Sequence, residues 1–240
     1  MSDPERYHSK RIGAPQYRTL ATALVAAFKR HPTAPPLRAA IDLGSSCGEL
    51  LWQLERLQPE LESVGLDNSP HPAELWRPKR GTFVSHDLEL DTHGHTDDKE
   101  LRRLVQGQRF DLISCVEVAE HLTDQRPLMR SINNLAHFDT MVLFSCAVPG
   151  QRGRHHVSPR WQDYWIQIFD RDGWWLDMPL TVALHRALGA EPTPDCWKNM
   201  MIFLRCACVD EPRQGKRPSA DSETVGRRRD FENGNRHVQF

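Results

Sequence analysis

Short apolar runs alternate along the chain with amphipathic stretches, and these two patterns predict strands and helices in turn. The runs that predict strands cover residues 39–42, 63–67, 82–87, 110–115, 140–146, 174–176 and 200–205. Apolar residues at helical spacing predict helices over 17–28, from Glu49 onward, over 126–135 and over 163–169. A charged loop leads into a short predicted helix at 100–105. This alternation predicts an α/β fold with a doubly wound parallel sheet covered on both faces.

The two ends of the chain differ from this middle part. Residues 1–15 are polar and contain Pro4, Gly13 and Pro15, which predicts an irregular arm. Residues 210–240 are charged and nearly devoid of large apolar side chains, which is typical of a disordered, solvated tail. We therefore assign residues 16–209 to one domain.

Composition excludes several classes of protein. The 240 residues are 39% hydrophobic and carry a formal net charge of -1, so no global attraction to nucleic acid or to an anionic membrane is expected. The six cysteines contain no C-x-x-C pair, which favours reduced, buried thiols over a zinc site or disulfides. No apolar signal region opens the sequence and no run approaches membrane-spanning length. We expect a cytoplasmic protein with no membrane partner.

A glycine-containing turn joins the first predicted strand to its helix. The strand ends at Asp42, and the chain passes through Gly44 and Gly48 before the helical pattern begins. Glycine permits a tight turn whose free N–H groups face a ligand at the carboxyl end of the strand. The spacing does not fit the G-x-G-x-x-G of a dinucleotide site, which disfavours an NAD-dependent oxidoreductase. Such a turn can also serve packing alone.

Acidic residues close the first three predicted strands: Asp42, Asp67 and Asp87. Ligands of a parallel α/β sheet bind beyond the carboxyl ends of the strands. An acid about twenty residues past a glycine turn is placed to accept hydrogen bonds from both ribose hydroxyls, and Asp67 has this position. The alternative is that Asp67 only caps a strand or forms a turn.

These motifs together resemble class I S-adenosylmethionine (SAM)-dependent methyltransferases. The resemblance rests on residues 42–48, on Asp67, on 86–88 and on the run 110–122, which contains the EVAEHL sequence of bacterial-type methyltransferase domains. Ser46 stands where the family usually has glycine. The resemblance implies a Rossmann-like, seven-stranded, mostly parallel sheet with an antiparallel last strand and SAM as cofactor. The cofactor-binding set it implies is Asp42, Gly44, Ser46, Gly48, Asp67, Asn68, Asp87, Leu88 and Cys115.

Glu117, Glu120 and His121 occupy positions i, i+3 and i+4 just after the fourth predicted strand. This spacing brings two carboxylates and an imidazole to one side, where they can share a divalent cation. The pattern is similar to the metal-binding element of small-RNA terminal 2′-O-methyltransferases, which implies Mg²⁺ or Mn²⁺ and a later histidine, His155 or His156. The alternative is that the glutamates cap helices and cradle the cofactor while His121 bonds locally.

The loop 147–160 follows the fifth predicted strand. It is similar to a "PGQGG-x-x-HVN" segment of bacterial methyltransferases, with Ser158 where asparagine is usual. A histidine there, His156, or His121 of the preceding motif, can deprotonate an acceptor hydroxyl because imidazole titrates near neutrality. A loop histidine bonded to the backbone is the alternative.

We therefore expect a methyltransferase acting on an oxygen of a small-molecule or glycan-like acceptor. One alternative is a metal-assisted RNA 2′-O-methyltransferase, with Arg152, Arg154 and Arg160 as a local phosphate patch; the charge balance does not favour it. Another is a methyltransferase-like binding subunit without catalysis. The acceptor is set by loops, so the sequence leaves it open, together with the oligomeric state.

Overall fold

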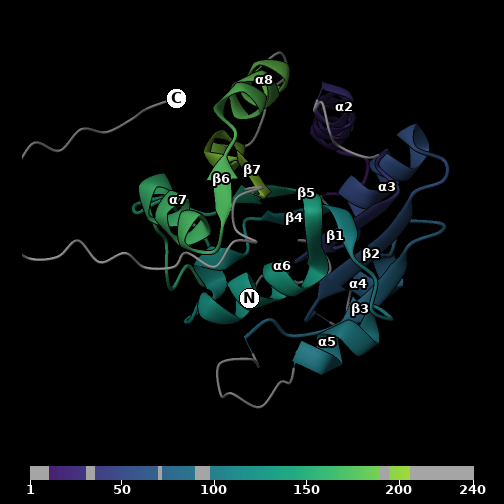
Figure 1. The fold of residues 1–240 in the computed structure, drawn as a ribbon, viewed down its shortest axis with the longest axis horizontal. Helices are drawn as coiled ribbons and strands as arrows, with labels where there is room; N and C mark the ends of the chain where they lie inside the picture. Colours follow the sequence, from purple (N-terminus) through teal and green to yellow (C-terminus); the bar gives the residue numbers. More distant parts are fainter. Residues whose placement is uncertain (1–10, 31–35, 70–71, 90–97, 190–194, 206–240) are drawn as a thin grey trace, which may run out of the picture. The chain divides into compact units, whose positions relative to one another are not determined.

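A mixed sheet organises the residues that the computed structural model describes, which are 11–30, 36–69, 72–89, 98–189 and 195–205. Within these ranges seven strands pair in the order β3-β2-β1-β4-β5-β7-β6 (Figure 1). The strands are β1 Ala39–Leu43, β2 Glu62–Asp67, β3 Thr82–Ser85, β4 Phe110–Val116, β5 Ala136–Ser145, β6 Trp174–Leu176 and β7 Met201–Arg205. Strands β1 to β5 pair in parallel, and β7 is antiparallel to both β5 and β6. The predicted mostly parallel sheet with an antiparallel last strand is confirmed.

Helices cover both faces of the sheet (Figure 1). One face packs against α2 Pro15–Arg30, α3 Glu49–Leu57 and α8 Met178–Leu188, and the other against α5 Asp98–Leu104, α6 Arg126–Leu135 and α7 Gln162–Arg171. The side-chain alternation of strands divides the apolar core accordingly, because Ile41 and Leu43 of β1 join one cluster and Ala40 joins the other. Three short elements complete the description: α4 Pro72–Leu75, η2 Ala119–His121 and η3 Asp195–Asn199.

Most predicted elements have their observed counterparts, and three differences have physical reasons. The sequence pattern did not indicate α8, which begins after Asp177, whose carboxylate accepts a hydrogen bond from the N–H of Leu180. Strand β5 starts four residues before its apolar run, and an irregular register between Phe110 and Leu112 accommodates the extra residues. The helix α2 starts at Pro15, inside the expected arm, because proline suits the first helical turn.

Other expectations fall partly outside the described ranges. Residues 1–10, most of the charged loop before α5, and the expected tail at 210–240 are not described. Cys47, Cys115 and Cys146 are buried and free, as predicted for reduced thiols. Among the described helices none is long and apolar enough to cross a membrane.

Candidate functional site

The turn after β1 has left-handed backbone at Gly44, Ser46 and Gly48, with φ of 77, 52 and 72°. The N–H groups of Gly44 and Ser45 both donate to the carbonyl of Leu66 at 2.8 Å, which fastens the turn to β2. A Cβ at position 44 would overlap Val118, so this position requires glycine. At Gly48 a Cβ would collide with Trp76 and Pro78, so the absence of a side chain there serves packing.

Asp67, at the end of β2, joins the same turn. Its Oδ2 accepts a hydrogen bond from the N–H of Ser46 at 2.8 Å, and its Oδ1 accepts one from the N–H of Ser69 at 2.9 Å. Each carboxylate oxygen keeps a further lone pair. The turn and the acid therefore lie side by side, with acceptor capacity remaining for a ligand.

Two adjoining cavities open at this edge of the sheet. The smaller cavity, of about 270 Å³, lies beyond the ends of β1 to β3. It is lined by Gly44, Ser46, Asp67, Asn68, Asp87, Leu88 and eight further residues, Arg11 among them. Six of the nine residues expected to bind cofactor thus come together there.

The larger cavity, of about 630 Å³, is lined by the start of α2, the glycine turn, the loop after β5 and the residues Val116, Glu117, Glu120 and His121. Asp42 lines it, whereas Gly48 and Cys115 line neither cavity and are packed in the protein interior. The two cavities share Arg11, Gly44, Glu117 and His121. A ligand can therefore extend from one cavity into the other.

Asp42 is a buried acid in the wall of the larger cavity. Its Oδ1 accepts a hydrogen bond from the Ser114 hydroxyl at 2.7 Å. Burial raises its pKa to about 7, and the hydrogen bond from Ser114 lowers it less than burial raises it. Asp42 can therefore be protonated or charged near neutral pH, depending on what occupies the cavity.

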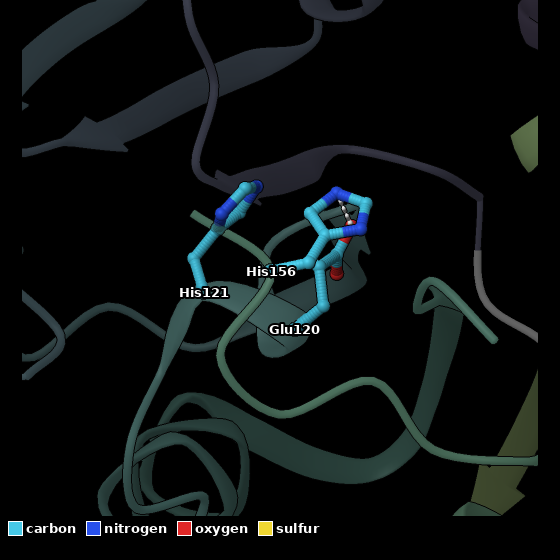
Figure 2. A group of neighbouring side chains, drawn as sticks. All are labelled: Glu120, His121 and His156. Atoms are coloured by element: carbon cyan, nitrogen blue, oxygen red, sulfur yellow. Dashed lines mark ion pairs between the residues drawn. The ribbon is translucent and has the colours of Figure 1, made fainter. Parts of the chain in front are cut away.

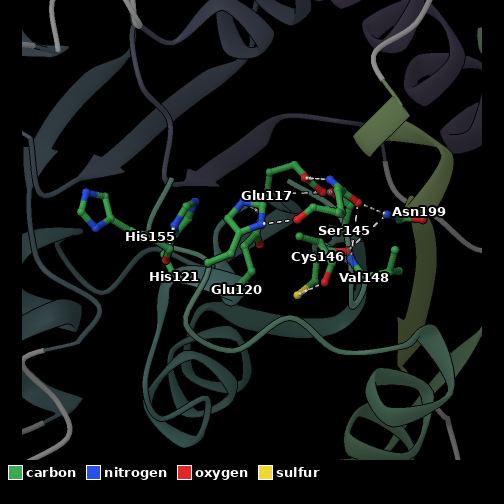
Figure 3. Close-up of polar contacts among 11 residues, drawn as sticks. Glu117, Glu120, His121, Ser145, Cys146, Val148, His155 and Asn199 are labelled. Carbon is green, nitrogen blue, oxygen red and sulfur yellow. Dashed lines mark hydrogen bonds and ion pairs between the residues drawn. The ribbon is translucent and has the colours of Figure 1, made fainter. Parts of the chain in front are cut away.

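Glu117 stands where the two cavities meet, with left-handed backbone at φ 58°. Its carboxylate accepts hydrogen bonds from the Ser145 hydroxyl at 2.9 Å and from the amide of Gln151 at 3.0 Å (Figure 3). Gln151 in turn accepts one from Asn199 at 2.9 Å. Burial, and then the nearby charge of Glu120, raise the pKa of Glu117 to about 7. This chain of contacts ties the loop after β5 to η3 and to the end of β4.

Glu120, His121 and His156 gather on the wall of the larger cavity, with one potential ligand atom of each within 4.8 Å of the others (Figure 2). The Glu120 side chain is fully buried, and neither of its oxygens has a hydrogen-bond partner within the described ranges. Nε2 of His156 lies 3.8 Å from its Oε1. The Glu117 carboxylate is not part of this group, because Ser145 and Gln151 hold it.

Backbone carbonyls fix the orientation of both imidazoles. Nδ1 of His156 lies 3.2 Å from the carbonyl of Gln151, and Nδ1 of His121 lies 3.1 Å from the carbonyl of His155 (Figure 3). Because a carbonyl only accepts, each Nδ1 donates its N–H to these carbonyls, and in the neutral form of each ring Nε2 then keeps its lone pair. Burial lowers the pKa of His121, which favours its neutral form. The site therefore presents two imidazoles beside one carboxylate that accepts no hydrogen bond from the described residues.

The sequence did not indicate several residues at the larger cavity, among them Arg11, Tyr17, Gln151 and Trp197. Tyr17 and Trp197 come from opposite ends of the described chain and pack edge to face at 5.0 Å. Arg152 and Arg154 line this cavity, but Arg160 lies over the ring of Tyr164 instead. Only contacts in the folded chain reveal such pairs.

Comparisons with known proteins bear on this geometry. Residues 41–142 match a family model described as "Methyltransferase domain". The chain is similar in structure to the plantazolicin methyltransferase BpumL in complex with a triazolic desmethylPZN analog and SAH, with a TM-score of 0.58 and 12% identity over 85% of this chain and 90% of that one. No curated protein sequence matches it significantly.

Two further solved structures share the fold. The sugar N-methyltransferase KedS8 from Streptoalloteichus matches with a TM-score of 0.55 and 11% identity over 79% of this chain and 88% of that one. The second is the O-methyltransferase from a trans-AT PKS multienzyme of Brevibacillus brevis, in complex with S-adenosyl-L-homocysteine. It matches with a TM-score of 0.52 and 16% identity over 80% of this chain and 72% of that one.

Proposed function

We propose that this protein is a class I SAM-dependent methyltransferase that transfers the methyl group of SAM to an oxygen of a small-molecule or glycan-like acceptor. The fold and the methyltransferase-domain match over residues 41–142 support this proposal. The observation that carries the proposal is the pair of adjoining cavities. One has a carboxylate suited to a ribose, and the other has two imidazole lone pairs. The reduced cysteines suit the cytoplasm, where we place the protein.

The smaller cavity suits the adenosine part of SAM. In this proposal the free lone pairs of Asp67 accept hydrogen bonds from the ribose hydroxyls, and Asp87 and Leu88 lie beside the adenine. The methionine part then passes Gly44 and Glu117 into the larger cavity. The cationic amino group of that methionine part would favour the charged form of Asp42 in the wall of the larger cavity.

The larger cavity supplies the acceptor site and the base. Bound SAM supplies an activated methyl group, so the protein must hold the acceptor oxygen in line and remove its proton. Nε2 of His156 accepts that proton, because its Nδ1 is already committed to the carbonyl of Gln151. Nε2 of His121 is the second candidate for the same step. The loop that carries His156 is held by hydrogen bonds from the N–H groups of Val157 and Ser158 to the carbonyl of Glu120.

A metal-assisted reaction is the second candidate, and the Glu120 carboxylate favours it, because it is buried and accepts no hydrogen bond from any described residue. A divalent cation bound by Glu120, His121 and His156 would satisfy that carboxylate and use both Nε2 lone pairs, with the Nδ1 hydrogen bonds orienting the rings. Two imidazoles with one carboxylate suit Mn²⁺ better than Mg²⁺, which prefers oxygen ligands. Such an ion would orient and polarise the acceptor hydroxyl, as a metal-assisted RNA 2′-O-methyltransferase requires.

The test combines SAM binding with labelled transfer. Calorimetric titration with SAM is expected to show one site per chain, and methyl-labelled SAM incubated with fractionated extract of the source cells identifies the acceptor. EDTA treatment followed by Mn²⁺ then separates the candidates: loss and recovery of transfer assign a metal, and unchanged transfer assigns a metal-free base. Absence of SAM binding overturns both and favours a binding subunit without catalysis.

A further inference from the structure

The loop after β5 fixes both imidazoles of the larger cavity through its backbone. The carbonyl of Gln151 lies 3.2 Å from Nδ1 of His156, and the carbonyl of His155 lies 3.1 Å from Nδ1 of His121. The three residues between these two carbonyls are exposed, with Gly153 in the middle.

Gly153 packs against the ring of His156. A Cβ at position 153 would lie 1.9 Å from Nε2, 2.1 Å from Cε1 and 2.6 Å from Cδ2 of that ring, which are distances of overlap. In the plane of the ring, a point outside it and this close to both Nε2 and Cε1 would be farther than 2.6 Å from Cδ2. Gly153 therefore covers a face of the imidazole and leaves the in-plane lone pair of Nε2 uncovered.

The backbone conformation of Gly153 does not explain why a glycine stands there. Gly150 of the same loop has left-handed backbone at φ 89°, where glycine avoids strain. The φ of Gly153 lies outside that region, in a range that other residues share. The side chain must be absent at 153 because the ring of His156 occupies its space.

The ring of His156 has little room to yield to a side chain at 153. Only 13% of the His156 side chain is exposed, and Nε2 lies 3.8 Å from the buried Oε1 of Glu120. The imidazole of His121 packs edge to face against it, with the ring centroids 5.2 Å apart (Figure 2). An added methyl group would therefore rotate the ring and lengthen its hydrogen bond to Gln151.

The loop is also fixed on both sides of Gly153. Before it, the side-chain amide of Gln151 donates to Glu117 at 3.0 Å (Figure 3). After it, the N–H of Ser158 donates to the carbonyl of Glu120 at 3.0 Å. A larger residue at 153 is therefore expected to displace the ring of His156 rather than the loop.

Resting on the methyl transfer proposed above, we propose that Gly153 is a positioning residue for His156. By packing on the face of the imidazole it keeps the Nε2 lone pair in the orientation that the reaction uses. Both candidates for the reaction depend on that lone pair, one to accept a proton and the other to bind a cation. The role of Gly153 is therefore the same in either.

The first measurement compares Gly153→Ala with Gly189→Ala. Gly189 also has an ordinary φ, at −67°, and it follows α8 and lines neither cavity. With methyl-labelled SAM and the acceptor fraction, Gly153→Ala is expected to lower kcat roughly 100-fold, because misplacing a reacting group costs about that much. Its calorimetric affinity for SAM is expected to stay within about twofold of wild type, and Gly189→Ala is expected to keep both values.

A double-mutant cycle tests whether this loss acts through the ring. In a His156→Gln background, Gly153→Ala is expected to change kcat less than about twofold further. A similar loss in both backgrounds would overturn the inference, because Gly153 would then act through another contact.

A second readout needs no acceptor. In protein with isotope-labelled histidine at about pH 8, where free imidazole is neutral, proton–nitrogen correlations report which ring nitrogen carries the proton, and His156→Gln identifies the signals. In wild type and Gly189→Ala the proton of His156 is expected on Nδ1, whereas Gly153→Ala is expected to show a mixture of both tautomers.

Each contrary outcome has a distinct meaning. Unchanged His156 signals in Gly153→Ala overturn the inference even when SAM binds and methyl transfer is observed. Changed signals with an unchanged kcat also overturn it, because the orientation of the ring would then not matter for transfer. A wild-type protein that binds no SAM instead overturns the proposed function, whatever the histidine signals show.

Discussion

One acid in each cavity, Asp67 in the smaller and Glu120 in the larger, shows how differently the chain satisfies a carboxylate there. In the smaller cavity both oxygens of Asp67 accept backbone hydrogen bonds, and the turn that donates one of them is fastened to β2. In the larger cavity both oxygens of Glu120 are buried and, among the described residues, neither accepts a hydrogen bond, although Nε2 of His156 lies 3.8 Å from one of them. An unsatisfied buried carboxylate costs free energy unless a proton, a cation or a ligand completes it. Asp67 is thus held in place by the chain before binding, whereas Glu120 is left for what binds to satisfy.

The largest effect is expected at the larger cavity, from His156→Gln. Loss of the Nε2 base is expected to lower kcat by roughly 10²- to 10⁴-fold, with affinity for SAM unchanged, because His156 does not line the smaller cavity. Labelled transfer to the acceptor fraction measures kcat, and calorimetry measures SAM affinity.

The neighbouring His155→Gln is the matched control. His155 contacts His121 through its backbone carbonyl, which the substitution keeps, and the His155 side chain is exposed. Methyl transfer by this variant is therefore expected to fall no more than about threefold. Equal losses in the two variants would contradict the assignment of His156 as the base.

Asp42→Asn is expected to raise stability at alkaline pH. The pKa of Asp42 is about 7 in the folded protein, against 3.8 ordinarily, so between these values the unfolded chain releases a proton that the folded protein keeps. The free energy of unfolding therefore falls as pH rises from about 4 to 7, and it stays at the lower value above pH 7. The variant avoids this loss, with a gain of roughly 4 kcal/mol at pH 8 that vanishes toward pH 4.

Urea unfolding between pH 4 and 8 measures this effect of Asp42. Ser114→Ala removes the hydroxyl that donates to Asp42 and lowers its pKa. In this variant the free energy of unfolding is expected to keep falling to a higher pH than in wild type. If the free energy of unfolding changed equally with pH in wild type and in Asp42→Asn, the pKa of Asp42 would not be raised in the folded protein.

At the smaller cavity, Asp67→Asn is expected to weaken SAM binding by roughly 30- to 100-fold. An amide cannot accept hydrogen bonds at both atoms, so a contact to a ribose hydroxyl or to the turn is lost. Calorimetric titration with SAM measures the change.

Asp111→Asn is a matched control at the opposite end of the sheet. Its Oδ2 likewise accepts two backbone N–H groups, from Arg38 at 2.8 Å and Ala39 at 2.9 Å. This variant is expected to lose about 1–3 kcal/mol of stability and no SAM affinity. If both variants lost only stability, Asp67 would be a structural residue and the ribose assignment would be wrong.

The difference between the two cavities also explains which parts of the site the sequence could predict. Gly44, Asp67 and Asp87 lie at or just beyond the ends of predicted strands. Strand ends of a parallel sheet meet at one edge, so a local pattern sufficed to bring these residues together. The same argument placed Gly48 in the site, although it packs against Trp76, because spacing does not tell which side of a turn faces the ligand.

The larger cavity depends on contacts that no local pattern contains. Gln151 meets Asn199 across 48 residues, and the start of α2 meets η3 through Tyr17 and Trp197. The sequence named His156 as a candidate, but the loop fold decides which of its nitrogens is available. Acceptor recognition rests on such loops, so it required the structure.

The smallest effect is expected from Ser46→Gly, which restores the residue that the family usually has. Ser46 has φ of 52°, a conformation that costs a side-chain-bearing residue about 1 kcal/mol, while glycine costs a similar amount of unfolded-state entropy. The contact with Asp67 comes from the backbone N–H, which both residues possess. SAM affinity is therefore expected to change less than about threefold and stability by less than about 1 kcal/mol, measured by calorimetry and urea unfolding. A tenfold loss of affinity would mean that the serine hydroxyl itself binds the ligand, and the smaller cavity would then depend on side chains as the larger one does.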